Sequence, residues 1–138
     1  MKNLAFLTVL LSLVLIISCD KDENDVSEKF KNLTGSEWAS DSLLVNGADA
    51  SGPGGLLESF KGNAKFNEDG TGEFGGYTGT WQFSPDEKNL IITTVSLPFP
   101  LTTTIVELTA VSLKVTTGFP NPADPENELK IRMTFKAV

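Results

Sequence analysis

The sequence predicts an all-β protein, an eight-stranded antiparallel up-and-down meander or barrel with a short N-terminal helix. From residue 36 onward, short runs of alternating apolar and polar residues follow one another. Alternation with a period of two is typical of strands that bury one face. Gly, Asn, Asp and Pro separate the runs, as they do in turns between antiparallel strands. The chain has 138 residues, a length that fits one such domain.

The first 18 residues are expected to be a signal peptide rather than part of the fold. Lys2 precedes an apolar run from Leu4 to Ile17 that only Thr8 and Ser12 interrupt. As a helix, this run would be about 21 Å long, too short for roughly 30 Å of hydrocarbon. The run ends just before Cys19, the only cysteine of the chain, and here the sequence resembles a bacterial lipoprotein signal. The resemblance implies that Cys19 is lipidated and anchors the protein to a membrane.

An acidic tether and a short helix are expected to follow Cys19. Residues 20–25 are charged or polar. Within them, Lys21-Asp22-Glu23 resembles the export signal that sends lipoproteins of Bacteroidetes-type bacteria to the outer face. This implies a location in the cell envelope. Asp25 is the predicted N-cap of the helix and Gly35 its end, with Phe30 and Leu33 on one side. We expect this helix to close one end of the barrel, so the chain divides into residues 1–18, 19–32 and 33–138.

Eight strands are expected after the helix. The clearest is the last, in which Leu129, Ile131, Met133 and Phe135 share one face. The other seven are predicted at residues 36–45, 63–67, 71–75, 79–84, 90–95, 102–109 and 112–117. Polar hairpin turns are expected at residues 67–70 and 84–89. The side chains predicted to point inward from these strands are Trp38, Ala64, Phe66, Phe74, Trp81, Phe83, Leu90, Ile92, Val106, Leu108, Leu113 and Val115.

Four segments together resemble a known family. In order, they are Leu33-Thr34-Gly35-Ser36-Glu37-Trp38, Phe66-Asn67-Glu68-Asp69-Gly70-Thr71, Gly79-Thr80-Trp81 and Val106-Glu107-Leu108-Thr109. They look like the recurring segments of the small lipocalin-like domains on bacterial lipoproteins, and the resemblance covers residues 33–138. It implies an eight-stranded barrel with no established activity for the group. Lipocalins in general hold apolar small molecules in the barrel.

Composition weighs against several classes of function. The sequence contains no histidine, which removes the Ser-His-Asp and Cys-His arrangements and the His-containing zinc sites. Paired-carboxylate chemistry stays open, but the acidic residues cluster in turns rather than on the inward faces of strands. We therefore expect no enzyme activity, and we expect no cofactor and no metal site. Without residues 1–18 the chain has 10 basic and 18 acidic side chains, because Lys2 is the only charged residue removed. This net charge of −8 repels phosphate backbones, so nucleic acid is not an expected partner.

Two functions remain open after these exclusions. In the first, interior aromatic side chains line a cavity for an apolar small molecule: Trp38, Phe66, Phe74, Trp81, Phe83 and Phe135. In the second, the core is solid and an apolar loop rim binds a protein or a surface polymer, through Leu56, Leu57, Phe60, Tyr77, Leu97, Phe99 and Phe119. These rim residues could equally fold inward and complete the core. A continuous void of about 300 Å³ or more would favour the first function, and its absence the second.

Overall fold

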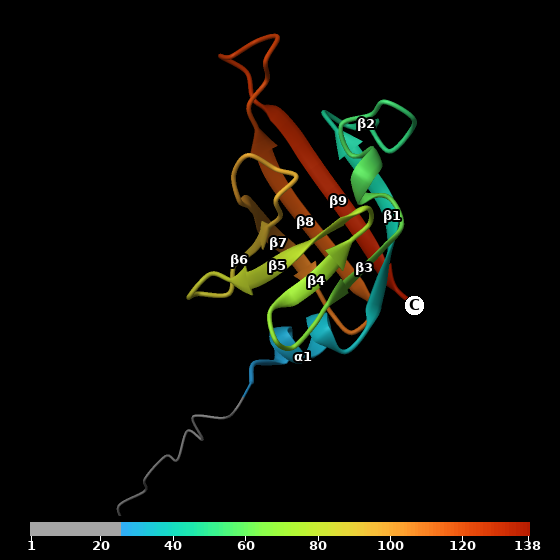
Figure 1. Ribbon diagram of the computed structural model, residues 1–138, viewed down its shortest axis with the longest axis vertical. Helices are drawn as coiled ribbons and strands as arrows, with labels where there is room; N and C mark the ends of the chain where they lie inside the picture. Colours follow the sequence, from blue (N-terminus) through green and yellow to red (C-terminus); the bar gives the residue numbers. More distant parts are fainter. Residues whose placement is uncertain (1–25) are drawn as a thin grey trace, which may run out of the picture.

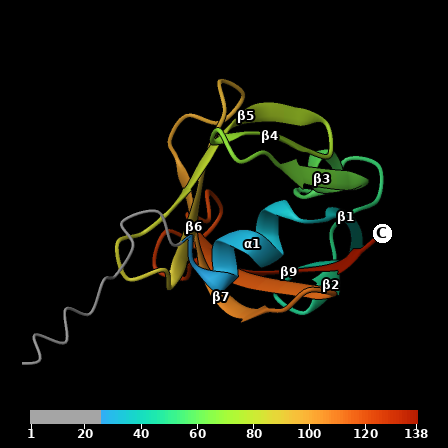
Figure 2. The same cartoon turned by 90° about the horizontal axis from the view of Figure 1, so that it is seen from below.

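Eight antiparallel strands close into a barrel in the computed structural model, which describes residues 26–138 (Figures 1 and 2). The predicted leader, Cys19 and the tether up to residue 25 lie outside the described residues. The barrel closes because β1 (Glu37–Val45) pairs with both β3 (Asn63–Phe66) and β9 (Leu129–Ala137). Each remaining strand pairs with its neighbours in chain order: β4 (Thr71–Phe74), β5 (Tyr77–Phe83), β6 (Asn89–Thr93), β7 (Leu101–Leu108) and β8 (Ser112–Phe119). The predicted fold class is confirmed.

A two-residue strand that the sequence analysis missed follows β1. This strand, β2 (Ala48–Asp49), turns back along the end of β1 and pairs with Leu44 and Val45. Asn46 and Gly47 form the turn with φ values of 51° and 81°. The two-residue turn whose twist matches that of the flanking strands requires a positive φ at both central residues. The extra strand leaves the alternating directions of the eight barrel strands unchanged.

Helix α1 (Glu28–Thr34) lies across one end of the barrel, which is called the closed end below (Figure 2). The predicted cap at Asp25 is wrong, because the Ser27 hydroxyl caps the helix by accepting a hydrogen bond from the Phe30 N–H at 3.1 Å. Gly35 ends the helix as predicted, and its N–H donates to the Lys31 oxygen. Leu33 is fully buried, and its main-chain oxygen accepts a 2.9 Å hydrogen bond from the Trp38 indole. The helix therefore closes this end, as expected.

The inward-facing side chains form one hydrophobic core. The predicted face of the last strand is confirmed, because Ile131, Met133 and Phe135 are all buried. Val106, predicted to point inward, is 59 % exposed. The pairing of β7 with β8 shifts register between Ile105 and Glu107, so Val106 is the extra residue of a bulge and the strict alternation fails there.

Successive connections between the barrel strands lie at opposite ends of the barrel. The turns at 67–70, 84–88 and 109–111 belong to the closed end, together with the C-terminus, since the Val138 N–H donates to the Glu37 oxygen at 2.9 Å. The connections after β1, β4, β6 and β8 lie at the other end, which we call the mouth (Figure 1). Within residues 26–138, no helix has the length and apolar character needed to cross a membrane.

Candidate functional site

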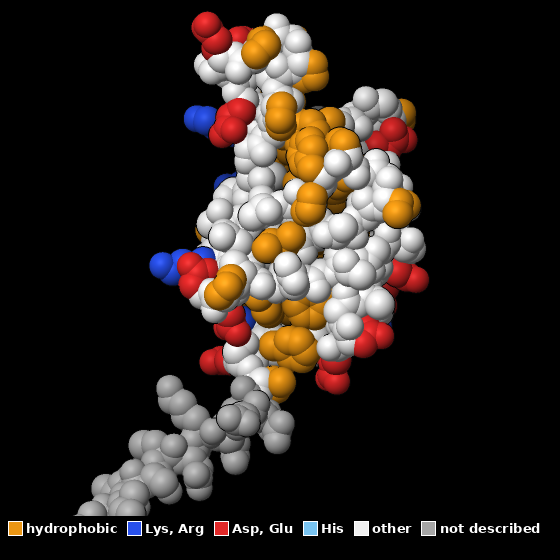
Figure 3. Space-filling model, turned by 60° about the vertical axis from the view of Figure 1, so that its left-hand side comes forward, with side chains coloured by type: hydrophobic (Ala, Val, Ile, Leu, Met, Phe, Trp, Pro, Cys, Tyr) orange, Lys and Arg blue, Asp and Glu red, His pale blue; other side chains and the backbone are white. Residues whose placement is uncertain are grey.

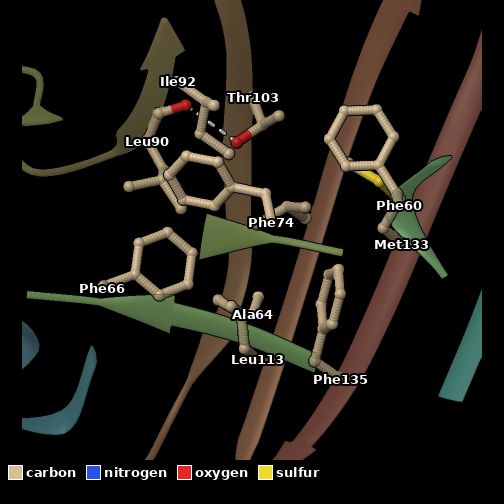
Figure 4. A pocket seen from close by; sticks show the side chains of 11 residues that line it. Phe60, Ala64, Phe66, Phe74, Leu90, Ile92, Thr103, Leu113, Met133 and Phe135 are labelled. Atoms are coloured by element: carbon tan, nitrogen blue, oxygen red, sulfur yellow. Dashed lines mark hydrogen bonds between the residues drawn. The ribbon is translucent and has the colours of Figure 1, made fainter. Parts of the chain in front are cut away.

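The barrel interior is almost completely filled by its own side chains. The inner void measures about 20 Å³, far below the roughly 300 Å³ of a small-molecule cavity. Its only polar lining group is Thr103, whose hydroxyl donates a 2.9 Å hydrogen bond to the Leu90 oxygen. A water molecule needs two or more polar partners, so this void is dry. The side chains that line it are Phe60, Ala64, Phe66, Phe74, Leu90, Ile92, Thr103, Leu113, Val115, Met133 and Phe135 (Figure 4).

The six predicted interior aromatics do not surround one cavity. Phe66, Phe74 and Phe135 line the inner void. The other three belong to the closed end, where Trp38 is fully buried beside α1. There the ring of Trp81 lies between 5.4 and 5.7 Å from the rings of Phe30, Phe66 and Phe83. These aromatic rings seal the closed end, so they act as core rather than as the wall of a pocket.

The predicted rim residues, in contrast, come together in a single apolar pocket at the mouth. This mouth pocket has a volume of about 100 Å³. Six of the seven rim residues line it, and the seventh, Phe99, packs on Phe119 with the ring centroids 5.7 Å apart. Leu101, Ile131 and Met133 complete the wall and were not predicted for the rim, although Ile131 and Met133 are on the inward face expected for the last strand. The lining residues are Leu56, Leu57, Phe60, Tyr77, Leu97, Leu101, Phe119, Ile131 and Met133.

The long connection between β1 and β3 builds one side of the mouth pocket. It contains a short 3-10 helix, η1 (Glu58–Phe60), which turns the apolar side chains of Leu57 and Phe60 inward. The Leu57 N–H donates to the Ala50 oxygen at 3.0 Å, which folds this connection back on itself. The Phe60 ring then meets the Tyr77 ring edge-on, with centroids 4.9 Å apart. This contact joins η1 to the start of β5.

A two-glycine turn between β4 and β5 allows η1 to approach closely. The Gly76 N–H donates a 2.7 Å hydrogen bond to the Ser59 oxygen. Gly75 has a φ of +63°, and a Cβ atom there would lie 2.5 Å from the same oxygen. Both the backbone conformation and the lack of space require glycine at this position. The position of Phe60 over the barrel thus depends on Gly75.

The mouth pocket has a buried inner wall and an exposed outer edge. Leu57 and Phe60 are 2 % and 7 % exposed, whereas Leu56 and Phe99 are 46 % and 45 % exposed. Hydrophobic side chains are visible together beneath the connection between β8 and β9, at the end opposite α1 (Figure 3). An apolar molecule could therefore reach the pocket from solvent, and the removal of its surface from water would drive binding.

The two longest connections at the mouth are acidic. The two longest connections at the mouth, residues 46–62 and 120–128, carry Asp49, Glu58, Asp124, Glu126 and Glu128 against a single Lys61. The Ser51 hydroxyl, and then the Ser51 N–H, hold the pKa of Asp49 below its usual value by donating hydrogen bonds to its carboxylate. No group of three or more potential metal ligands forms among the residues that the structure describes. The mouth therefore combines an apolar pocket with acidic connections.

Comparison with known proteins identifies the fold. No protein-family model matches the sequence, and no curated protein matches it. Among solved structures, the chain is similar to a lipocalin, the bovine odorant binding protein, in its complex with a selenium-containing odorant. The TM-score is 0.52 at 12 % sequence identity, over 84 % of this chain and 76 % of that chain. The chain therefore folds as a lipocalin-like barrel domain.

Proposed function

We propose that this protein is a lipoprotein, anchored to a bacterial membrane through Cys19, whose mouth pocket binds an apolar group of a small molecule. The observation that carries the proposal is the convergence of rim residues from four separate connections and strand ends on one pocket open to solvent. The nearly filled interior supports a site at the mouth rather than deep in the barrel. The odorant bound by the similar bovine protein supports an apolar ligand by analogy of fold.

The volume of the mouth pocket limits the size of the bound group. An engineered apolar cavity of about 150 Å³ accepts benzene, so a pocket of about 100 Å³ fits a group smaller than this ring, such as a short alkyl chain. Burying roughly 120 Å² of apolar ligand surface would contribute about 3 kcal/mol at 25 cal/mol per Å². This corresponds to a dissociation constant in the millimolar range. A ligand that binds more tightly needs further contacts beyond this group.

The carboxylates at the mouth select the charge of the ligand. The two longest connections at the mouth contain five carboxylates and one lysine. Their combined potential repels anions and attracts cations over a distance of about a Debye length, ~8 Å at physiological ionic strength. The ligand is therefore a neutral or cationic molecule rather than a carboxylate.

Anchoring through Cys19 would place the protein in the cell envelope. The apolar run before Cys19 and the acidic residues after it support export to the outer membrane. The described chain begins at the closed end, where α1 lies across the barrel. The mouth then faces away from the anchoring membrane, toward the molecules of its compartment.

The alternative function is that of an interaction module for a protein or a surface polymer. The exposed fractions of Leu56 and Phe99 at the edge of the mouth favour it, since exposed apolar and aromatic side chains are common anchors in protein interfaces. The nearly filled interior is also consistent with this function.

Native mass spectrometry of the lipidated protein, isolated in detergent from its own cells, separates the two functions. We expect a retained small molecule in the wild-type protein and its loss in Tyr77→Ala, which opens the wall of the mouth pocket. Val106→Ala, at an exposed position of the outer wall, is the control that keeps the adduct. A co-purified protein in place of a small molecule would support the interaction module instead.

Anchoring is tested separately by labelling cells with radioactive palmitate. The label is expected on the wild-type protein and not on Cys19→Ser, which should be released from membranes. Label that persists in Cys19→Ser would contradict lipidation at this residue.

A further inference from the structure

We infer that Phe60 is a movable partition between the mouth pocket and the inner void, and that it sets how long an alkyl chain the protein accepts. This inference rests on the proposed function, since it concerns the same pocket. Phe60 and Met133 are the two residues that line both spaces. In Figure 4 they lie next to each other at one side of the inner void, with Phe60 extending from η1. The two spaces are therefore separated by side chains alone.

Of these two residues, Phe60 is the one whose backbone lies outside the strand pairing. Met133 belongs to β9 and is paired with Leu43 on one side and Val115 on the other, so its backbone is fixed in the barrel wall. Phe60 ends a 3-10 helix of three residues, and its N–H donates only to the nearby Leu57 oxygen at 3.0 Å. Its ring is retained by packing, including the edge-on contact with Tyr77. A rotation of this side chain breaks no strand pairing.

Turning Phe60 aside would join two apolar spaces into one channel. The mouth pocket of about 100 Å³ would then continue through the volume of the ring itself into the void of about 20 Å³ beside Phe74 and Leu90. Such a channel is narrow, because the surrounding barrel is packed with side chains. An unbranched alkyl chain is narrow enough for such a channel. A ring or a branched chain is too wide for it.

The narrow channel and the acidic connections at the mouth indicate the class of ligand. It is a neutral or cationic molecule with one unbranched alkyl chain, whose polar end stays among the carboxylates of the mouth. A short chain fills the mouth pocket without disturbing Phe60. A longer chain has to displace the Phe60 ring from its contact with Tyr77, and this cost offsets the gain from each added CH₂ group.

A chain-length series of straight-chain alcohols, from 1-butanol to 1-nonanol, tests the partition by NMR titration of the protein. Each CH₂ group that enters an apolar site improves affinity about fourfold, which corresponds to about 0.8 kcal/mol. In the wild-type protein we expect this increase for the shorter alcohols and then a plateau at the length where the chain meets Phe60. In Phe60→Ala the plateau should disappear, and the fourfold steps should continue for at least two further CH₂ groups.

Two further variants keep the partition testable even if Phe60→Ala does not fold. Phe60→Leu, with a smaller side chain, should move the plateau to a longer alcohol. Phe83→Ala, a half-buried position at the closed end that lines neither space, should keep the wild-type plateau. A steady increase with no plateau in the wild-type protein, or the same plateau in both Phe60 variants, would overturn the partition while leaving the mouth site in place. Failure of every alcohol to bind the wild-type protein would overturn the proposed function, and the partition with it.

Discussion

The indole nitrogen of Trp81 donates a 2.9 Å hydrogen bond to the main-chain oxygen of Asn67, the first residue of the turn between β3 and β4. Trp81 is on β5, so this bond ties a buried side chain of the barrel to a turn at the closed end. Its ring also packs against Phe30 of α1. A single side chain thus joins the helix, the turn and the barrel wall at the sealed end.

Trp81→Ala should be among the most destabilising single substitutions in the protein. Trp81 is 6 % exposed, and truncation of a buried Trp to Ala costs about 3–5 kcal/mol through lost transfer energy and the cavity left behind. Denaturant unfolding followed by circular dichroism measures the change. Phe99→Ala, at a 45 % exposed position, is the control and should stay within about 1 kcal/mol. A loss below about 1 kcal/mol for Trp81→Ala would be inconsistent with its structural role.

Gly75→Ala and Gly76→Ala form a matched pair of substitutions next to η1. A Cβ atom at Gly75 would lie 2.5 Å from the Ser59 oxygen, and the φ of +63° is unfavourable for alanine. At Gly76 the nearest atom, the same oxygen, would lie 3.5 Å from the new Cβ, an ordinary contact. Gly75→Ala should lower the free energy of unfolding by about 1–3 kcal/mol and weaken ligand binding at the mouth. Gly76→Ala should do neither, and equal effects in both variants would contradict the close approach of η1 to this turn.

The mouth should face away from the membrane in the anchored protein. Ser59 lies at the mouth, and Glu68 lies in a turn at the closed end. In a protein whose Cys19 is blocked by lipid, a cysteine placed at either position gives a single site for a fluorophore. A quencher embedded in the bilayer should then quench the label at Glu68→Cys more strongly than the label at Ser59→Cys. The opposite order would refute this orientation.

The sequence was sufficient to predict the barrel because strand alternation and turn residues act locally. The inward face of the last strand, the turn at Asn67–Gly70 and the end of the helix at Gly35 all follow from short-range rules. The missed strand β2 had a signal as well, since Asn46-Gly47 is a strong hairpin pair. No sequence signal indicated that Val106 points outward, because a bulge depends on the register of the neighbouring strand rather than on the residue itself.

The candidate site was predicted only in part, because the sequence does not show how side chains pack inside the barrel. The parity of antiparallel strands was enough to bring Leu57, Tyr77 and Phe119 to the same end of the barrel, where they line one pocket. The same residue types make a core or a cavity wall, however, so the sequence did not show that the interior is nearly filled. The division of the remaining space by Phe60 depends on how one loop folds over the barrel, which the sequence pattern does not specify.

Binding at the mouth is tested most directly by locating a bound apolar group within the protein. The measurement is a set of isotope-filtered nuclear Overhauser effects between 1-butanol, a small neutral probe with an unbranched chain, and the methyl groups of the labelled protein. We predict contacts to Leu57, Leu101 and Ile131, which line the mouth pocket. Contacts to Leu90, Leu113 and Val115 of the inner void, with none at the mouth, would contradict the central claim that the mouth is the binding site.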